Sequence, residues 1–304
     1  FFHAEDGIRD SVASRGLGDV YKRQVLYSTG GQTTQGSREL IWVDRSGDIE
    51  LVDPSLTGAT YFSAILSPND DRVALSMVEA GGTGTSQIWV KELPDGPLTR
   101  LTTGSSPAGR PIWSRDGRNI SFIADYADNI ILPHARSITA DGSSEGVSDL
   151  LLEHTRPVRE VFFTPDERGL IFRQGQANTG TADLGLMDLQ TGSIDETLLA
   201  SDFSEFGVSL SPEGRWMAYS SDASGRPEIF VRPFPEGTSR VQVSANGGRS
   251  PVWAHNGREL FFVDADGVMS VATYRTEPSF AVSYTHLRAH ETLRYLVCRL
   301  LLEK

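Results

Sequence analysis

The sequence is poor in cysteine, in long apolar runs and in positive charge. Cys298 is the only cysteine among the 304 residues, so residues 25–281 contain neither a disulfide nor a thiolate. No apolar run approaches the roughly 20 residues that a membrane-spanning helix needs, so we expect no membrane insertion. The formal net charge is −12. This charge opposes nucleic-acid binding, which depends on neutralising phosphates.

Both ends of the chain resemble translated sequencing-adapter DNA. Four segments carry the resemblance: residues 4–10, 14–24, 282–292 and 296–304. Segments of this origin have no part in a fold. We therefore expect residues 1–24 and 282–304 to pack poorly and to be dispensable. His286 and His290, spaced like two metal ligands on one helix face, belong to this excluded part, as does Cys298.

Residues 25–281 form a segment of 257 residues, enough for one large domain that is itself a fragment of a longer protein. Without the eight basic and six acidic residues of the two ends, 20 Lys and Arg face 34 Asp and Glu, a net charge of −14. His134, His154 and His255 are scattered and match no metal spacing. We expect no metal and no cofactor.

A turn motif recurs five times along this segment, at steps of 47, 50, 47 and 43 residues. Its copies are Ser67-Pro68-Asn69-Asp70, Ser114-Arg115-Asp116-Gly117, Thr164-Pro165-Asp166-Glu167, Ser211-Pro212-Glu213-Gly214 and Ala254-His255-Asn256-Gly257. Serine first, proline second and glycine fourth suit a type I turn. Runs of β-forming residues flank each copy, which predicts a hairpin.

A third β-rich run follows most copies and a fourth follows several, which predicts that each unit is a four-stranded antiparallel meander. A period of 40–50 residues is typical of a propeller blade. The fold class is therefore all-β, a β-propeller with about six blade equivalents, the first of which lacks its innermost strand. An open stack or a β-sandwich is the alternative architecture. Core packing between blades, rather than ligand stacking, explains the recurrent tryptophans, Trp42, Trp89, Trp113, Trp216 and Trp253.

These repeats resemble the PD40 repeat of TolB and other WD40-like propellers. Residues 39–47, 225–235 and 257–262 are most similar to the C-terminal propellers of membrane-anchored bacterial serine/threonine kinases. The resemblance implies a periplasmic or otherwise extracytoplasmic sensor or scaffold that binds a protein or peptide. No kinase motif is present in this chain. The pattern is interrupted at residues 130–138, where Pro133 and His134 break the third strand of one blade.

Two short motifs resemble functional sites, an esterase nucleophile and a calcium loop, but the sequence around each motif argues against that function. Residues 142–146 fit Gly-x-Ser-x-Gly, but an esterase elbow needs a strand before it and a helix after it. We expect a turn between the third and fourth strands of a blade, and no catalytic residue. Residues 264–267 begin like a calcium loop without its later ligands, and a hairpin turn is expected there.

The candidate ligand site lies where the innermost strands begin, at one mouth of the propeller channel. The loops that lead into these strands carry Arg110, Arg159, Glu205, Phe206 and Arg249. Three arginines around a mouth could hold an acidic peptide or a small carboxylate ligand. Solvated loop charge is the alternative interpretation.

Three functions remain open: a non-catalytic sensor or protein-interaction module of a kinase, an accessory propeller of a serine peptidase of the prolyl oligopeptidase type, and a TolB-like periplasmic envelope protein. Fold alone does not separate them.

Overall fold

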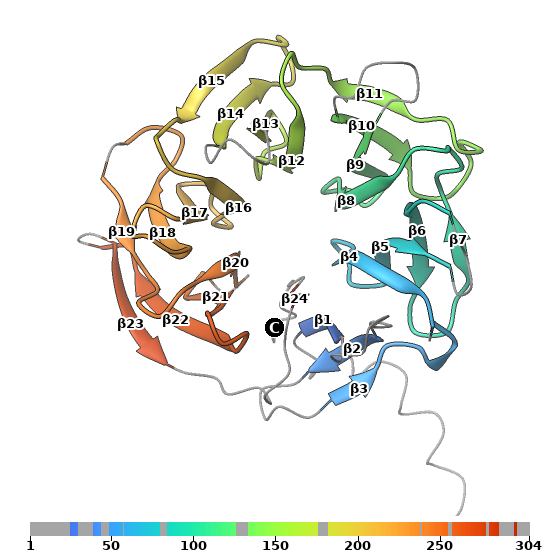
Figure 1. Cartoon of the computed structure of the whole chain (residues 1–304), viewed down its shortest axis with the longest axis horizontal. Helices are drawn as coiled ribbons and strands as arrows, with labels where there is room; N and C mark the ends of the chain where they lie inside the picture. The colour runs from blue at the N-terminus through green and yellow to red at the C-terminus, as the bar shows by residue number, and fades with distance from the viewer. Residues whose placement is uncertain are drawn as a thin grey trace, which may run out of the picture.

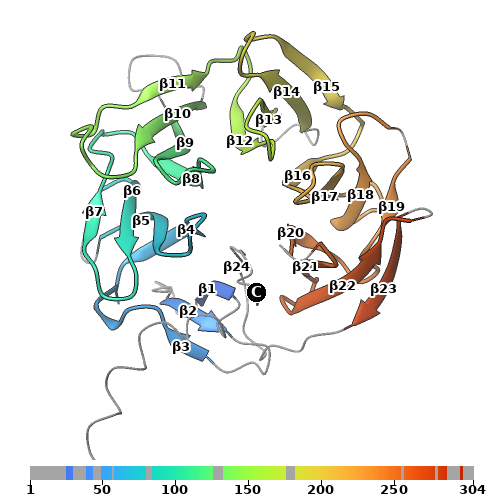
Figure 2. The same ribbon diagram turned by 180° about the vertical axis from the view of Figure 1, so that it is seen from behind.

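The computed structural model describes residues 25–29, 39–43, 49–56, 58–79, 84–125, 133–175, 182–237, 239–254, 257–277, 280–285 and 295–296. Their strands form six four-stranded antiparallel sheets that surround one axis like the blades of a propeller (Figures 1 and 2). Among these residues, one 3-10 turn, η2 (Pro54–Leu56), joins the first two blades. The predicted all-β propeller is confirmed.

Five blades consist of four consecutive strands, which follow one another from the innermost to the outermost. Blade 2 contains β4 (Thr60–Leu66), β5 (Arg72–Val78), β6 (Gln87–Glu92) and β7 (Leu98–Arg100). Blade 3 contains β8 (Ala108–Trp113), β9 (Asn119–Asp125), β10 (Pro133–Thr139) and β11 (Asp149–Leu152), and blade 4 contains β12 (Val158–Phe163), β13 (Gly169–Gln174), β14 (Asp183–Asp188) and β15 (Ile194–Leu199). Blade 5 contains β16 (Glu205–Leu210), β17 (Trp216–Ser221), β18 (Glu228–Pro233) and β19 (Val241–Gln242), and blade 6 contains β20 (Arg249–Trp253), β21 (Glu259–Val263), β22 (Met269–Arg275) and β23 (Ala281–Thr285).

Blade 1 combines the two ends of the chain. It contains β24 (Tyr295–Leu296), β1 (Val25–Thr29), β2 (Glu39–Val43) and β3 (Ile49–Leu51). The predicted incomplete first blade thus supplies β1–β3, and β24 occupies the missing inner position (Figure 1). β23 likewise extends across the expected boundary at residue 281. Both strands pair through backbone hydrogen bonds, which an open sheet edge offers to any strand.

The five turn motifs close the hairpins between the two inner strands of blades 2–6, as the repeat predicted. In every copy the amide of the fourth residue donates to the carbonyl oxygen of the first. The N···O distances are 3.0 Å for Asp70–Ser67, 2.9 Å for Gly117–Ser114, 2.8 Å for Glu167–Thr164, 2.8 Å for Gly214–Ser211 and 3.1 Å for Gly257–Ala254. The fourth residue has a positive φ in all five copies, which is why glycine recurs there. His255 lies outside the described residues.

The hydroxyl of the first motif residue adds a second hydrogen bond. Ser67, Ser114, Thr164 and Ser211 each accept the amide of the residue five positions later, at 2.8–3.0 Å. Ala254 has no hydroxyl, so its copy keeps only the backbone bonds. The recurrent Ser/Thr therefore fixes the far side of the turn as well as its start.

Neighbouring motifs contact one another across the blades. Arg72 Nη2 donates to Gly117 O and Arg115 Nη1 donates to Pro165 O, both at 2.7 Å. Pro165 and Gly214 line one cavity of about 380 Å³ between blades 4 and 5. The first four motifs therefore share one face of the propeller, here called the motif face, as expected.

Apolar side chains between adjacent blades form the core. Trp42 and Trp89 belong to one cluster between blades 1 and 2, Trp113 lies between blades 2 and 3, and Trp253 lies between blades 5 and 6. Two of these indoles also form a hydrogen bond with the preceding blade. Trp113 Nε1 donates to Ile65 O at 3.0 Å, and Trp253 Nε1 donates to Ser209 O at 2.9 Å. The role in core packing is confirmed; Trp216 is half-buried against the same core as Trp253.

The expected interruption at Pro133 and His134 is wrong for the described part of that segment. Pro133 is the first residue of β10, which pairs with β9 without a break from Pro133 to Thr139. Proline is tolerated at the first position of a strand because its missing amide removes no interior ladder bond. Residues 130–132 lie outside the described residues. Within the described residues, no helix has the length and apolar character to cross a membrane.

Candidate functional site

All five inner strands of blades 2–6 carry a β-bulge near their first residues. The pairing register shifts between Tyr61 and Ser63, Gly109 and Ile112, Val158 and Glu160, Phe206 and Ser209, and Arg249 and Val252. Bulges occur often beside functional sites because they redirect a side chain. Arg110, Gly207 and Ser250 have positive φ at these bulges. The backbone is therefore specialised where the inner strands begin, on the face opposite the motifs, here called the start face.

The predicted site residues lie on these strands. Arg110 belongs to β8, Arg159 to β12 and Arg249 to β20, while Glu205 and Phe206 open β16. The expectation of loop positions is therefore corrected: the strands begin earlier than their apolar runs do. The inner strands surround the axis in Figure 1, so the residues share a position in their blades.

Glu160 of β12 is the centre of a polar cluster that joins three blades. Its carboxylate accepts a hydrogen bond from Arg110 Nη1 of blade 3, and its Oε2 accepts the Gly207 amide of blade 5 at 3.0 Å. Arg173 Nη2 of β13 lies 3.6 Å from Glu160 Oε1. One carboxylate thus fixes the bulges of both flanking inner strands.

Arg110, Arg159, Arg173 and Glu160 are here called the arginine hub. Burial lowers the pKa of Arg173; Glu160 opposes this effect, and the positive charges of Arg110 and Arg159 reinforce it. Among the described residues, the buried Nε atoms of Arg159 and Arg173 have no hydrogen-bond partner. Three guanidinium groups and one carboxylate therefore gather at one place in an otherwise acidic molecule. The Arg110 side chain is 55% exposed and opens this group to solvent.

The structure does not bring all the predicted residues into the hub. Glu205 is fully buried and accepts hydrogen bonds from Ser201 Oγ at 2.7 Å and Ser221 Oγ at 3.3 Å. Burial raises the pKa of Glu205 to about 7, with smaller contributions from Asp183 and Asp222. Phe206 is half-buried and Arg249 is exposed. Only Arg110 and Arg159 of the predicted set belong to the hub.

Glu160 and Arg173 were not among the predicted site residues, although the sequence contained a signal for them. Glu160 lies four residues before Thr164, the first residue of the third turn motif, and Arg173 lies four residues after Gly169, which pairs with Thr164. The hairpin register therefore places Glu160 and Arg173 opposite each other. Cross-strand pairs of opposite charge stabilise a sheet. The contact of Glu160 with blades 3 and 5 had no such signal.

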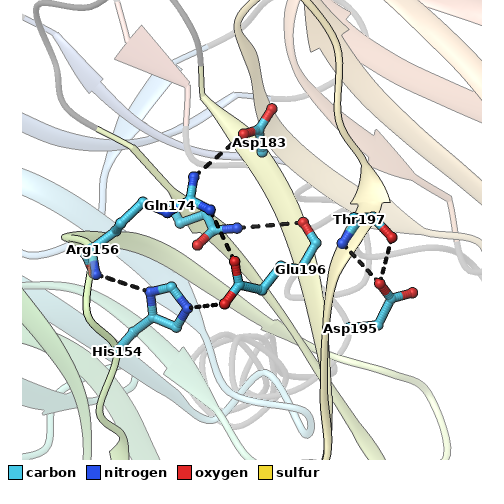
Figure 3. A network of polar contacts seen from close by, with 7 residues as sticks. All are labelled: His154, Arg156, Gln174, Asp183, Asp195, Glu196 and Thr197. Carbon is cyan, nitrogen blue, oxygen red and sulfur yellow. Dashed lines mark hydrogen bonds and ion pairs between the residues drawn. The ribbon is translucent and has the colours of Figure 1, made fainter.

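A second polar network stabilises the segment that connects blade 3 to blade 4, between β11 and β12 (Figure 3). His154 Nε2 lies 3.3 Å from Glu196 Oε1, and its Nδ1 accepts the Arg156 amide at 3.1 Å. Arg156 Nη2 also binds Glu196, at 2.9 Å, while its Nη1 lies 3.7 Å from Asp183. His154 is buried against the Phe172 ring. These contacts explain His154 as a structural residue of the connection.

The Gly-x-Ser-x-Gly segment forms the expected turn between β10 and β11. Ser144 Oγ shares a hydrogen bond with Thr139 Oγ1. No hydrogen bond joins Ser144 to a histidine in the described ranges. Asp264 likewise caps the turn between β21 and β22, since its Oδ1 accepts the Asp266 and Val268 amides at 3.0 and 2.9 Å. Both motifs are explained by turn geometry.

Comparison with known proteins places the fold but not the function. No protein-family model matches the chain. A Bacillus subtilis protein described as the uncharacterized peptidase YuxL is 24% identical over 183 residues, which cover 48% of this chain. The chain covers only 28% of the length of that relative.

Solved structures resemble the whole propeller more fully. TolB from Acinetobacter baumannii superposes with a TM-score of 0.67 at 18% identity, over 88% of this chain and 66% of that one. TolB from Agrobacterium tumefaciens gives 0.62 at 16% identity, over 86% and 88%. A prolyl endopeptidase gives 0.56 at 13% identity, over 86% of this chain and 42% of that one. The chain therefore has a TolB-like β-propeller fold.

Proposed function

We propose that the chain is a non-catalytic binding propeller whose ligand is an acidic segment of a protein or peptide, held by the arginine hub together with Arg249 and Phe206. The observation that carries this proposal is the surplus of guanidinium groups at the hub. Buried charge is costly unless it is paired, and each guanidinium can grip a carboxylate through two parallel hydrogen bonds. An acidic ligand meets both conditions.

The net charge of the molecule makes such a site selective. The overall field of a protein with net charge −12 repels anions, whereas a local cationic patch attracts them at short range. Binding should therefore weaken as salt rises, because exposed charges are screened over about 8 Å at physiological ionic strength. The half-buried Phe206 directly precedes Gly207, whose amide binds Glu160, so we propose that its ring supplies an apolar contact to the ligand.

The test is fluorescence anisotropy of a labelled acidic peptide titrated with the full chain, beside neutral and basic peptides of equal length. Arg110→Ala, Arg159→Ala and Arg249→Ala should each weaken binding of the acidic peptide. Arg118→Ala is the matched control, because Arg118 is 85% exposed on the motif face. An affinity that ignores all three substitutions would reject the site.

For the parent protein, the favoured role is the extracytoplasmic sensor of a serine/threonine kinase, with residues 25–281 as the folded unit. The similarity of residues 225–235 to kinase-linked propellers supports this role. An accessory propeller of a prolyl oligopeptidase-type peptidase is the second candidate, supported by the B. subtilis relative and the prolyl endopeptidase. A TolB-like envelope protein is the third. Sequencing the flanking gene separates them: a kinase upstream, a hydrolase downstream or a signal peptide upstream.

A further inference from the structure

The arginine hub has a fixed surplus of charge. Arg110, Arg159 and Arg173 contribute three positive charges and Glu160 contributes one negative charge, which leaves two positive charges uncompensated. One Glu160 oxygen faces Arg110 and Arg173, and the other accepts the Gly207 amide. Within the described part of the chain, the buried Nε of Arg159 has no hydrogen-bond partner.

The side chains of the hub also differ in their exposure to solvent. The Glu160 and Arg173 side chains are 8% and 17% exposed, whereas Arg110 is 55% exposed. A ligand that arrives from solvent meets Arg110 first, with Glu160 and Arg173 beneath it. Because the inner groups are shielded from water, a charge mismatch there is screened less than one at an open surface.

We propose that the hub selects acidic peptides with two neighbouring carboxylates, and that Glu160 sets this number by acting as an internal carboxylate. This inference rests on the proposed function, because it concerns the same site. A peptide with one carboxylate leaves a guanidinium without a counter-charge, and a peptide with three adds a carboxylate without a partner. Glu160 further keeps Arg110 in place by fixing the bulges of β8 and β16.

The experiment uses the full chain and four labelled peptides of equal length with zero, one, two or three adjacent aspartates, the others being replaced by asparagine. The wild-type protein should bind the two-aspartate peptide about tenfold more tightly than the one-aspartate peptide, as expected for the loss of one charge-assisted contact. Glu160→Gln keeps the oxygen that accepts from Gly207 and removes one negative charge, so the preference should move to three aspartates.

A second variant makes the test independent of any change at Glu160. Arg159→Gln removes one positive charge, so the preference should move from two aspartates to one. Circular dichroism and a thermal melt confirm that each variant is folded, and Arg118→Gln is the control with an unchanged preference. If acidic peptides bind but every variant keeps the wild-type preference, the charge-counting role is rejected while the proposed function stands. If no acidic peptide binds, the proposed function itself fails.

Discussion

Replacing Glu205 by glutamine is expected to stabilise the protein at pH 8 and to leave it unchanged at pH 4. Glu205 is fully buried, and in the described structure its Oε2 has no hydrogen-bond partner. Ser201 and Ser221 supply neutral donors to the other oxygen only. Because burial dominates, the pKa rises from 4.5 to about 7, and the folded protein favours the neutral carboxyl.

The sign and size of the effect follow from proton linkage. Between pH 4.5 and 7 the folded state binds more protons than the unfolded state, so the free energy of unfolding falls as pH rises. The free energy of unfolding falls by about 1.4 kcal/mol for each pH unit of this interval, which gives a loss of about 3 kcal/mol over the whole interval. Glutamine imitates the neutral carboxyl and should recover most of this loss at pH 8.

The assay is urea unfolding of the wild type and Glu205→Gln at intervals between pH 4 and pH 8. Glu228→Gln is the matched control, because Glu228 is equally buried in the same blade. Burial would raise its pKa, but bonds from Ser244, the Gly247 amide and Arg226 outweigh burial and lower it. Ionised Glu228 therefore adds to the free energy of unfolding above its unfolded pKa, and this addition is lost as pH falls through its lower folded pKa. Glu228→Gln should accordingly destabilise the protein at pH 8. Equal effects of the two variants at pH 8 would refute the reasoning.

Three further predictions concern the repeat and the serine motif. Ser211→Ala should lower the free energy of unfolding by about 1 kcal/mol, because the Trp216 amide loses its hydrogen bond to the Ser211 hydroxyl. Ala254→Ser should raise the free energy of unfolding, because it supplies the hydroxyl that this copy lacks. Urea midpoints measure both variants, and a change in the same direction for both would contradict the role given to the hydroxyl. Trp113→Phe should destabilise by about 1 kcal/mol in the same assay, because it removes the indole donor of the half-buried Ile65 carbonyl. A neutral result would show that this hydrogen bond is dispensable. We expect neither the wild type nor Ser144→Ala to hydrolyse peptides or esters, and we expect the two to be equally stable. Labelling of Ser144 by a serine-directed reagent would oppose the proposed non-catalytic role.

The fold could be predicted from local features of the sequence. Each hairpin depends on a turn of four residues and on the β-forming runs beside it, and both are visible in a single copy such as Ser211-Pro212-Glu213-Gly214. The repeat period then requires neighbouring blades to bury each other's faces. The pairing of β24 with β1 had no comparable signal, because Leu296 and its partner Tyr27 lie 269 residues apart in the sequence.

The site could be predicted only in part. The repeat placed Arg110 and Arg159 at equivalent starts of inner strands, which is why they were found. The bulges were not visible in the sequence, although they decide which side chains face the neighbouring blade. Glu205 was expected beside the arginines but faces Ser201 and Ser221, while Glu160 reaches Gly207 because the β16 bulge exposes that amide.

Hydrogen–deuterium exchange of the full chain with and without the two-aspartate peptide tests most directly whether the start face holds an acidic ligand at the arginine hub. Exchange should slow at the first residues of β8, β12 and β16, including the Gly207 amide, and should stay unchanged at the five turn motifs. Slower exchange confined to the motif face would contradict the claim.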